Sequence, residues 1–314
     1  SLRMAHKIAA VMGGTGFLAR YIVPRLAKAG YRVRVASRHP SRARHLLTQG
    51  EVGQIQAVYA PIQNAAAVAR AVEGADLVIN LIAIFYESGK GQSFDATMVR
   101  GAATVAEAAA KAGVRRLIHV SALGAGANHS SESTRCKALG EDATLRAFPK
   151  ATIVRPGLMV GAEDTFFNRF SALPAVPLIG GGKTRFQPVF VGDVADAISA
   201  IAADDQTAGR VYDLVGPGVY SFRALIDLMQ SVTGSKAPQV HLPWGVAELI
   251  ALASSLAPVA PPITIDQIKR LRTDNVADGS LPGLEALGVD PTPIETVLPS
   301  YLVRFRNGGQ YAEV

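Results

Sequence analysis

Three closely spaced glycines near the start of the chain constrain its fold more than any other feature. Gly13, Gly14 and Gly16 stand between a short apolar run, residues 7–12, and a helical pattern, residues 17–29. A plain turn from strand to helix needs one or two glycines, whereas a third lets the backbone approach a pyrophosphate at the helix N-terminus. We therefore expect a dinucleotide-binding turn that includes Gly13, Thr15, Gly16, Phe17 and Leu18.

Short apolar runs alternate with helical patterns through the first half of the chain. This alternation predicts an α/β fold, a Rossmann-type doubly wound parallel sheet with helices on both faces. We expect a dinucleotide-binding domain over residues 4–155 and a smaller C-terminal α/β lobe over residues 156–314, interleaved with the sheet of the first. The expected strands are residues 7–12, 31–37, 76–83, 115–123 and 151–156, and the expected helices are residues 17–29, 96–112, 133–147, 194–203, 222–233, 244–256 and 265–271, with one more after Ser41.

Composition and charge exclude several classes of protein. The single cysteine, Cys136, cannot form an internal disulfide, and the six histidines lack metal-ligand spacing, so we expect no metal site. The net charge of +7 comes without the alternation of aromatic and basic residues that is typical of RNA-binding proteins. We expect no nucleic-acid partner. Prolines interrupt the longest uncharged stretch, residues 249–265, so we expect no membrane span.

The residues after the second expected strand bear on the choice between NAD and NADP. An NAD site requires an aspartate or glutamate there for the ribose hydroxyls, but the chain has Ser37 and Arg38. Arg38, together with Arg42, can instead pair with a 2′-phosphate. These positions favour NADP(H), although arginine runs also form ordinary solvated surfaces. Arg32, Arg34 and Arg44 crowd the same stretch.

The glycine turn, Ser121 after a strand and Lys137 on a helix together resemble the short-chain dehydrogenase/reductase superfamily, extended type. The resemblance implies a serine followed by Tyr-x-x-x-Lys, in which the tyrosine transfers the proton and the lysine holds the nicotinamide ribose. Ser121 and Lys137 match, but the tyrosine position is Ser133. A serine hydroxyl is a far weaker acid on a shorter side chain, so no efficient turnover is expected and no catalytic residue is assigned.

Tyr86 could replace the missing acid, but it is more simply explained as a loop aromatic. Cys136 lies beside Lys137, where its pKa could be lowered, but it is more simply explained as a small helix residue. The dinucleotide would also pass Leu81 and Ala83 at the end of one expected strand, and Pro156 and Leu158 at the end of another.

Longer stretches resemble a narrower family, the atypical short-chain dehydrogenases that serve as an NADPH-binding accessory subunit of respiratory complex I (NADH:ubiquinone oxidoreductase). The stretches FYESGK and GGGKTRFQPVFVGDVADA are long and specific, and the resemblance runs from about residue 7 to residue 306. It implies NADP(H) as a structural cofactor and other complex I subunits as partners. It also implies a peripheral position on the cytoplasmic face of a bacterial inner membrane, or on the matrix side of the mitochondrial one, near lipid or the quinone site.

Two alternatives remain open from the sequence. One is an NADPH-dependent reductase or epimerase of a small carbonyl or sugar substrate, and the other is an NADPH-sensing binding protein. The apolar residues 244–256 fit a helix that lies against a membrane or a partner, but a helix buried in the lobe is the favoured interpretation. Lys183 and Arg185, on a glycine-rich loop, fit an acidic surface or lipid headgroups as well as a mobile hairpin.

Overall fold

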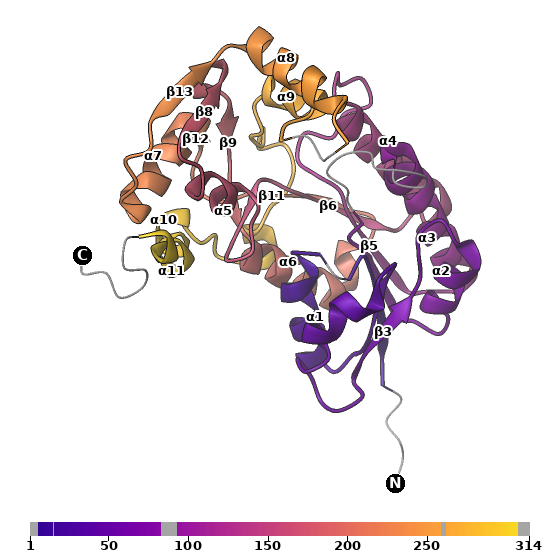
Figure 1. Ribbon diagram of the computed structural model, residues 1–314. Helices are drawn as coiled ribbons and strands as arrows, with labels where there is room; N and C mark the ends of the chain where they lie inside the picture. Colours follow the sequence, from indigo (N-terminus) through magenta and orange to yellow (C-terminus); the bar gives the residue numbers. More distant parts are fainter. Residues whose placement is uncertain (1–5, 15, 83–92, 259–261, 307–314) are drawn as a thin grey trace.

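A seven-stranded parallel sheet forms the centre of the computed structural model, which describes residues 6–14, 16–82, 93–258 and 262–306 (Figure 1). The strand order β11–β6–β5–β4–β1–β2–β3 reverses direction between β1 and β4, as in a doubly wound sheet. The predicted fold class is confirmed. The strands are β1 (Ile8–Met12), β2 (Arg32–Ser37), β3 (Ile55–Tyr59), β4 (Leu77–Asn80), β5 (Arg116–Val120), β6 (Thr152–Pro156) and β11 (Val211–Leu214).

Helices cover both faces of the sheet, and each face has its own hydrophobic core (Figure 1). α1 (Ala19–Lys28) and α6 (Val191–Ala203) pack on one face, and α2 (Ala65–Val72), α3 (Gly101–Lys111) and α4 (Glu132–Ala147) on the other. Because both faces are covered, the central strand β1 is an uninterrupted apolar run, IAAVM, rather than an alternating one. Small residues allow neighbouring helices to pack closely. A Cβ on Gly140 of α4 would lie only 2.2 Å from the carbonyl oxygen of Met98, in the helical segment before α3.

Several elements differ from the sequence prediction. The helix expected after Ser41 is a 3₁₀ helix, η1 (Pro40–Leu46), whose buried Ala43 and Leu46 stand three residues apart as that helix requires. The helix expected at residues 96–112 begins as a π-helix, η2 (Asp95–Arg100), before α3. The sequence analysis did not identify β3 or α2. β3 is an edge strand in which only Ile55 is buried, so its hydrophobic pattern is weak.

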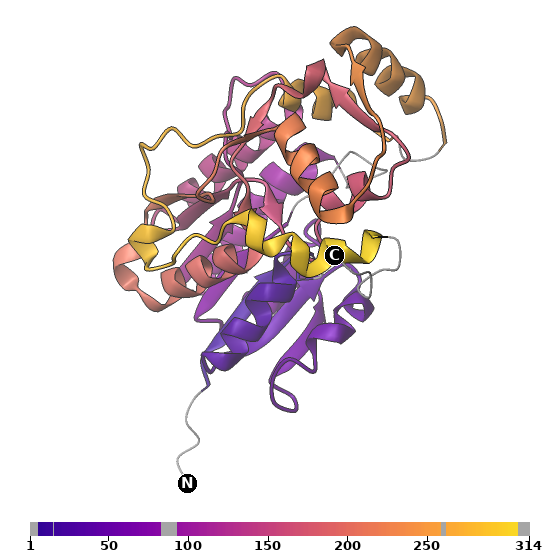
Figure 2. The ribbon, with the colours of Figure 1, turned by 90° about the vertical axis from the view of Figure 1, so that its left-hand side faces the viewer.

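The second half of the chain adds β11 and α6 to the sheet and places the rest beyond the carboxyl ends of the strands (Figures 1 and 2). The rest has its own core, which includes Phe167, Phe222 and Leu225. Its helices are α5 (Phe166–Ser171), α7 (Phe222–Thr233), α8 (Trp244–Ser255), α9 (Ile265–Leu271), α10 (Ile294–Val297) and α11 (Pro299–Leu302). Its strand pairs are β7 (Met159–Val160) with β10 (Val189–Phe190), β8 (Val176–Ile179) with β13 (Gln239–Leu242), and β9 (Arg185–Phe186) with β12 (Tyr220–Ser221).

Helix α8 is not the buried lobe helix that the sequence analysis favoured. Only Ala247 and Ala251 are buried, and the leucines face outward: Leu249 is 67% exposed, Leu252 53% and Leu256 85%. The interpretation failed because the helix turns its small residues inward and its large apolar residues outward, against the usual rule. Among the residues that the structure describes, no helix is both long enough and apolar enough to cross a bilayer.

Candidate dinucleotide site

The glycine turn after β1 is tied closely to its neighbouring strands. The amides of Gly13 and Gly14 both donate to the carbonyl of Ala36 on β2, at 2.9 and 3.2 Å. Gly13 has φ of +81°, and a Cβ there would lie 3.2 Å from the backbone of the segment after β4. A Cβ on Gly14 would lie 2.2 Å from Val35 Cγ1. The positive φ at Gly13 and the close packing at Gly14 therefore favour glycine at both positions without any ligand.

Gly16 differs from the other two glycines because it is exposed, and a Cβ there would meet only the carbonyl oxygen of Gly13 at 3.5 Å. Space for a ligand therefore lies at the third glycine, next to the N-terminus of α1. Phe17 packs edge-on against Tyr21, and Leu18 is buried in the core beneath the turn, so their backbone and not their side chains would meet a cofactor. Thr15 lies outside the described residues.

The end of β2 offers an unpaired hydroxyl and unpaired charges. Ser37 is buried, and its hydroxyl has no hydrogen-bond partner in the part of the chain that the structure describes. Arg38 and Arg42 are exposed and have no carboxylate partner among the described residues. A 2′-phosphate on the adenosine ribose would satisfy both the hydroxyl and the cations, so these residues fit NADP(H).

Not every arginine between residues 32 and 44 lies near the carboxyl end of β2. Arg34 donates to the carbonyls of Ala71 and Glu73 at the end of α2. Arg32 stands at the start of β2, about 17 Å of strand from Ser37. Arg32 and Arg34 crowd the same stretch of sequence as Arg38, but in the structure they do not lie at the end of β2 beside Ser37.

Lys137 on α4 is the unsatisfied group at the nicotinamide end. Its ammonium has no hydrogen-bond acceptor among the described residues. Burial, with the nearby charge of Arg270, lowers the pKa of Lys137 to about 8, while Asp266 opposes the shift. Ribose hydroxyls would supply the missing acceptors, so Lys137 fits the role of a ribose-binding residue without any proton transfer.

The lowered pKa of Lys137 predicts how the cofactor-free protein responds to pH. The lysine titrates near 10.5 when unfolded and near 8 when folded, so between these values the unfolded chain holds a proton that the folded chain lacks. Stability therefore rises with pH across this window. We expect wild type to gain about 2 kcal/mol between pH 7.5 and 10 relative to Lys137→Met, measured by urea unfolding. Parallel pH curves for the two proteins would contradict the placement of Lys137.

Ser121, the other residue that matches the short-chain dehydrogenase pattern, donates its hydroxyl proton to a neighbouring carboxylate. Its hydroxyl donates to Glu141 Oε2 at 2.7 Å, and Glu141 is buried on α4. Arg155 on β6 holds the same carboxylate with two donors, Nη2 at 2.7 Å and Nε at 3.1 Å. Since an ionised carboxylate cannot donate, Ser121 can accept a hydrogen bond from a ligand but cannot supply one.

The tyrosine position is occupied by a buried contact between two parts of the chain. Ser133 is 3% exposed, and its hydroxyl donates to Asp266 Oδ2 of α9 at 2.6 Å. The Ser133 amide and the Ser131 hydroxyl donate to Asp266 Oδ1, at 3.2 and 2.9 Å. Burial alone would raise the pKa of Asp266, but the hydrogen bonds from Ser133 and Ser131 outweigh it and hold the pKa below its ordinary value.

Sequence reasoning missed both carboxylates. Glu141 carried a signal, because Ser133, Lys137 and Glu141 are spaced four apart and so share the face of α4 that meets the sheet. Asp266 carried none, since it lies 133 residues from Ser133.

The remaining predicted positions divide into three groups. Leu81 and Pro156 lie at the carboxyl ends of their strands, on the same edge of the sheet as the glycine turn, and Leu158 packs against the core that contains Phe167 and Phe222. Cys136 is buried within α4. Ala83 and Tyr86 lie outside the described residues.

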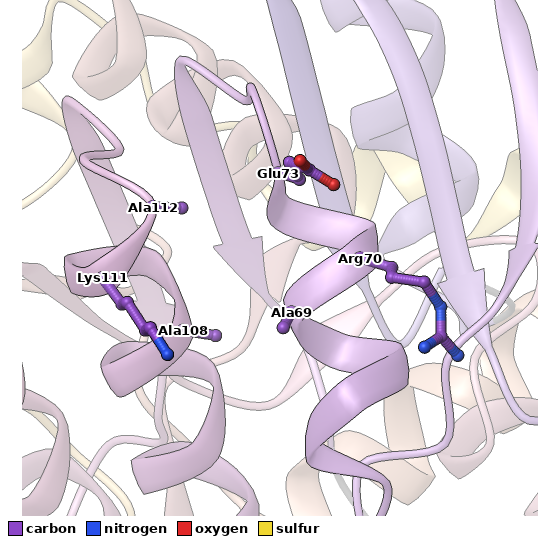
Figure 3. A pocket seen from close by; sticks show the side chains of 6 residues that line it. All are labelled: Ala69, Arg70, Glu73, Ala108, Lys111 and Ala112. Atoms are coloured by element: carbon purple, nitrogen blue, oxygen red, sulfur yellow. The ribbon is translucent and has the colours of Figure 1, made fainter.

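A metal cluster and a pocket between helices are two other kinds of site to consider among the described residues. These residues contain no cluster of metal-ligating side chains. Figure 3 shows a shallow pocket between α2 and α3, lined by Ala69, Arg70, Glu73, Ala108, Lys111 and Ala112. It lies at the C-terminal ends of these helices, hence at the edge of the sheet opposite the glycine turn.

Comparison with known proteins agrees with this geometry. A family model described as NAD(P)H-binding matches residues 13–205. The triphenylmethane reductase of Citrobacter sp., solved as a complex with NADP(H), superposes with a TM-score of 0.71 at 17% identity, covering 93% of this chain and 99% of that one. That likeness shows the fold. The sheet and the family match assign an NAD(P)(H) cofactor to the site, and the unpaired Ser37, Arg38 and Lys137 fit it.

Sequence relatives identify a narrower group. The mitochondrial NADH dehydrogenase [ubiquinone] 1 alpha subcomplex subunit 9 of Mus musculus is 36% identical over 304 residues, covering 95% of this chain and 80% of the relative. The protein of the same name from Arabidopsis thaliana is 34% identical over 316 residues, covering 96% and 79%. The chain therefore belongs to the family of NADH dehydrogenase [ubiquinone] 1 alpha subcomplex subunit 9, with an NAD(P)H-binding region over residues 13–205.

Proposed function

We propose that this chain is an accessory subunit of respiratory complex I that holds NADP(H) as a structural part and has no independent turnover. The observation that carries the proposal is the contact between Ser133 and Asp266. It replaces the proton donor in a site whose glycine turn, Ser37 and Lys137 otherwise fit the cofactor.

The loss of catalysis has two parts. General acid–base catalysis typically contributes about 10²- to 10⁴-fold, and Ser133 cannot supply it because its hydroxyl is bonded to a carboxylate. Ser121 cannot donate to a substrate carbonyl either, since Glu141 accepts its proton. A tightly held cofactor still stabilises the fold, because any ligand that binds only the native state does so.

NADP(H) is the form that the described residues favour. Arg38 and Arg42 carry positive charge beside the buried Ser37 hydroxyl, and that end of β2 has no carboxylate to accept a bond from the ribose of NAD.

The names of the relatives support a place in complex I, where this subunit would stabilise the junction between the hydrophilic and membrane arms. The experiment is a gentle detergent extraction of native membranes that carry a tagged copy of this chain. A native gel stained for NADH dehydrogenase activity then follows the tag. Co-migration with the activity is the expected result, whereas a free soluble chain would overturn the assignment and reopen the reductase and sensor alternatives.

We also propose that the outer face of α8 contacts the membrane from the cytoplasmic or matrix side. Leu249, Leu252 and Leu256 form an exposed apolar face, and Figure 2 shows α8, in orange-brown, at the outer end of the lobe. Lys269 on α9, the helix that packs against α8, is exposed and has no carboxylate partner among the described residues. An exposed apolar helix face with a lysine on the helix packed against it fits an anionic lipid surface.

Vesicle flotation tests this surface. We expect wild type to float with phosphatidylcholine vesicles that contain phosphatidylglycerol, and Leu249→Gln with Leu252→Gln to bind at least about tenfold more weakly. A matched control, Val52→Gln with Leu139→Gln, removes two exposed apolar side chains elsewhere and should bind as wild type does. Absence of wild-type flotation, with co-migration in complex I intact, would assign α8 to a protein neighbour instead.

A further inference from the structure

The Asp266 carboxylate of α9 binds the first residues of α4 and the residue that caps it. Asp266 accepts three hydrogen bonds there, from the Ser131 hydroxyl and from the amide and hydroxyl of Ser133. Both serines are almost fully buried, and Asp266 also faces the positive end of the α4 dipole. Two further contacts join the same segments: Asn275 Nδ2 donates to the Leu123 carbonyl at 3.1 Å, and His129 Nε2 lies 3.3 Å from the Thr273 hydroxyl.

The opposite side of α9 holds α8. Ile268 is buried against Ala247 and Ala251, which are the only buried residues of α8. Arg272, just after α9, stacks on the Trp244 ring at 4.6 Å and pairs with Glu248 at 2.6 Å. Ile179 of β8 completes this cluster, so α8 is held between β8 and α9, and loss of order in α9 would remove one side of its support (Figure 1).

The dinucleotide site lies one helical turn from the Asp266 contact. Lys137 follows Ser133 by four residues on the same face of α4, and the Asp266 charge acts on the Lys137 ammonium. A cofactor whose ribose accepts hydrogen bonds from Lys137 would fix the first turns of α4. The Asp266 bonds would then transmit that order to α9, and the Ile268 and Arg272 contacts would transmit it to α8.

We propose that Asp266 is a positioning residue that links occupancy of the dinucleotide site to the order of α9 and of the exposed surface of α8. The inference rests on the proposed cofactor, and it gives a reason why a cofactor that is never turned over is retained. NADP(H) would keep a docking surface in place that lies outside the dinucleotide domain. Linkage is reciprocal, so whatever binds α8 would also tighten the hold on NADP(H).

Hydrogen–deuterium exchange on the purified full chain, with and without NADPH, tests the link. In wild type we expect NADPH to slow amide exchange in the glycine turn, in α4 and also in α8 and α9, by about 5-fold or more. In Asp266→Ala, NADPH should still slow exchange in the glycine turn and α4, but not in α8 and α9. Ser133→Ala removes the hydroxyl that donates to Asp266 and should therefore weaken the NADPH-dependent protection of α8 and α9 in part.

A matched control separates coupling from general loosening. Asp274→Ala removes a carboxylate from the same segment, but Asp274 pairs with the exposed Arg185 and does not touch α4. This variant should keep the wild-type response of α8 and α9 to NADPH.

Two results would overturn the link. One is NADPH protection at the glycine turn of wild type with no effect on α9, which leaves the cofactor assignment standing. The other is an unchanged response of α9 in Asp266→Ala. A wild type that shows no protection at the glycine turn would remove both the link and the proposed cofactor.

Discussion

Replacing Arg38 with glutamate is expected to weaken NADPH binding by about 100-fold or more. A charge-assisted hydrogen bond contributes roughly 1.5–3 kcal/mol, and the new carboxylate would also repel the 2′-phosphate. Because Arg38 is exposed and has no carboxylate partner among the described residues, the cofactor-free fold should be unaffected. The effect should therefore appear in the NADPH dissociation constant and in the loss of NADPH-dependent thermal stabilisation.

Arg32→Glu is the matched control for this change. It makes the same charge reversal on the same strand, but at the end away from Ser37. Its NADPH affinity should stay within a few-fold of wild type. Arg38→Glu should also bind NADH at least as well as wild type does, since a glutamate can accept bonds from ribose hydroxyls. A melting temperature that still rises with NADPH in Arg38→Glu as it does in wild type would remove Arg38 from the site.

Restoring the tyrosine, in Ser133→Tyr, is expected to destabilise the protein and to create no reductase. Position 133 is buried, and Asp266 already stands at hydrogen-bond distance from its side chain. Overpacking costs about 1–3 kcal/mol, and disturbing a buried hydrogen bond to a charged group costs about as much again. We expect a loss of roughly 2–6 kcal/mol by urea unfolding, visible also as a lower melting temperature.

The activity of Ser133→Tyr tests whether the missing tyrosine is the only reason for the lack of turnover. Ser121 would still donate to Glu141, so a substrate carbonyl would lack its second donor. NADPH oxidation with simple aldehydes should stay at the level of wild type. Ser133→Ala, which loses the hydroxyl without adding volume, should be destabilised less than the tyrosine variant. Rapid NADPH oxidation by a stable Ser133→Tyr protein would show that only the tyrosine is missing.

The parts of the fold that depend on local sequence could be predicted. The glycine turn, the buried strands β1 and β4 and the helices α7 and α9 follow from short patterns, because each pattern contains the residues that it needs. The edge strand β3 was missed because one of its faces is partly open to solvent. Helix α8 was assigned to the interior because its composition is apolar, and composition does not say which face of a helix is covered.

The chemistry of the site depended on long-range contacts that no local pattern contains. The absence of the tyrosine could be deduced from Ser133 and Lys137 alone. What fills its place could not, since the chain must fold before Asp266 meets Ser133. The contacts of Glu141 with Ser121 and Arg155 likewise join the end of β5, α4 and β6, which come together only when the sheet forms.

The central claim is that this chain is a subunit of complex I and holds NADP(H) as a structural cofactor. The most direct test is to purify the complex through a tag on this subunit and to measure bound NADP(H) before and after turnover with NADH and quinone. The account predicts one NADP(H) per tagged chain, with its amount and redox state unchanged by turnover. Absence of NADP(H), or oxidation of bound NADPH as quinone is reduced, would contradict it.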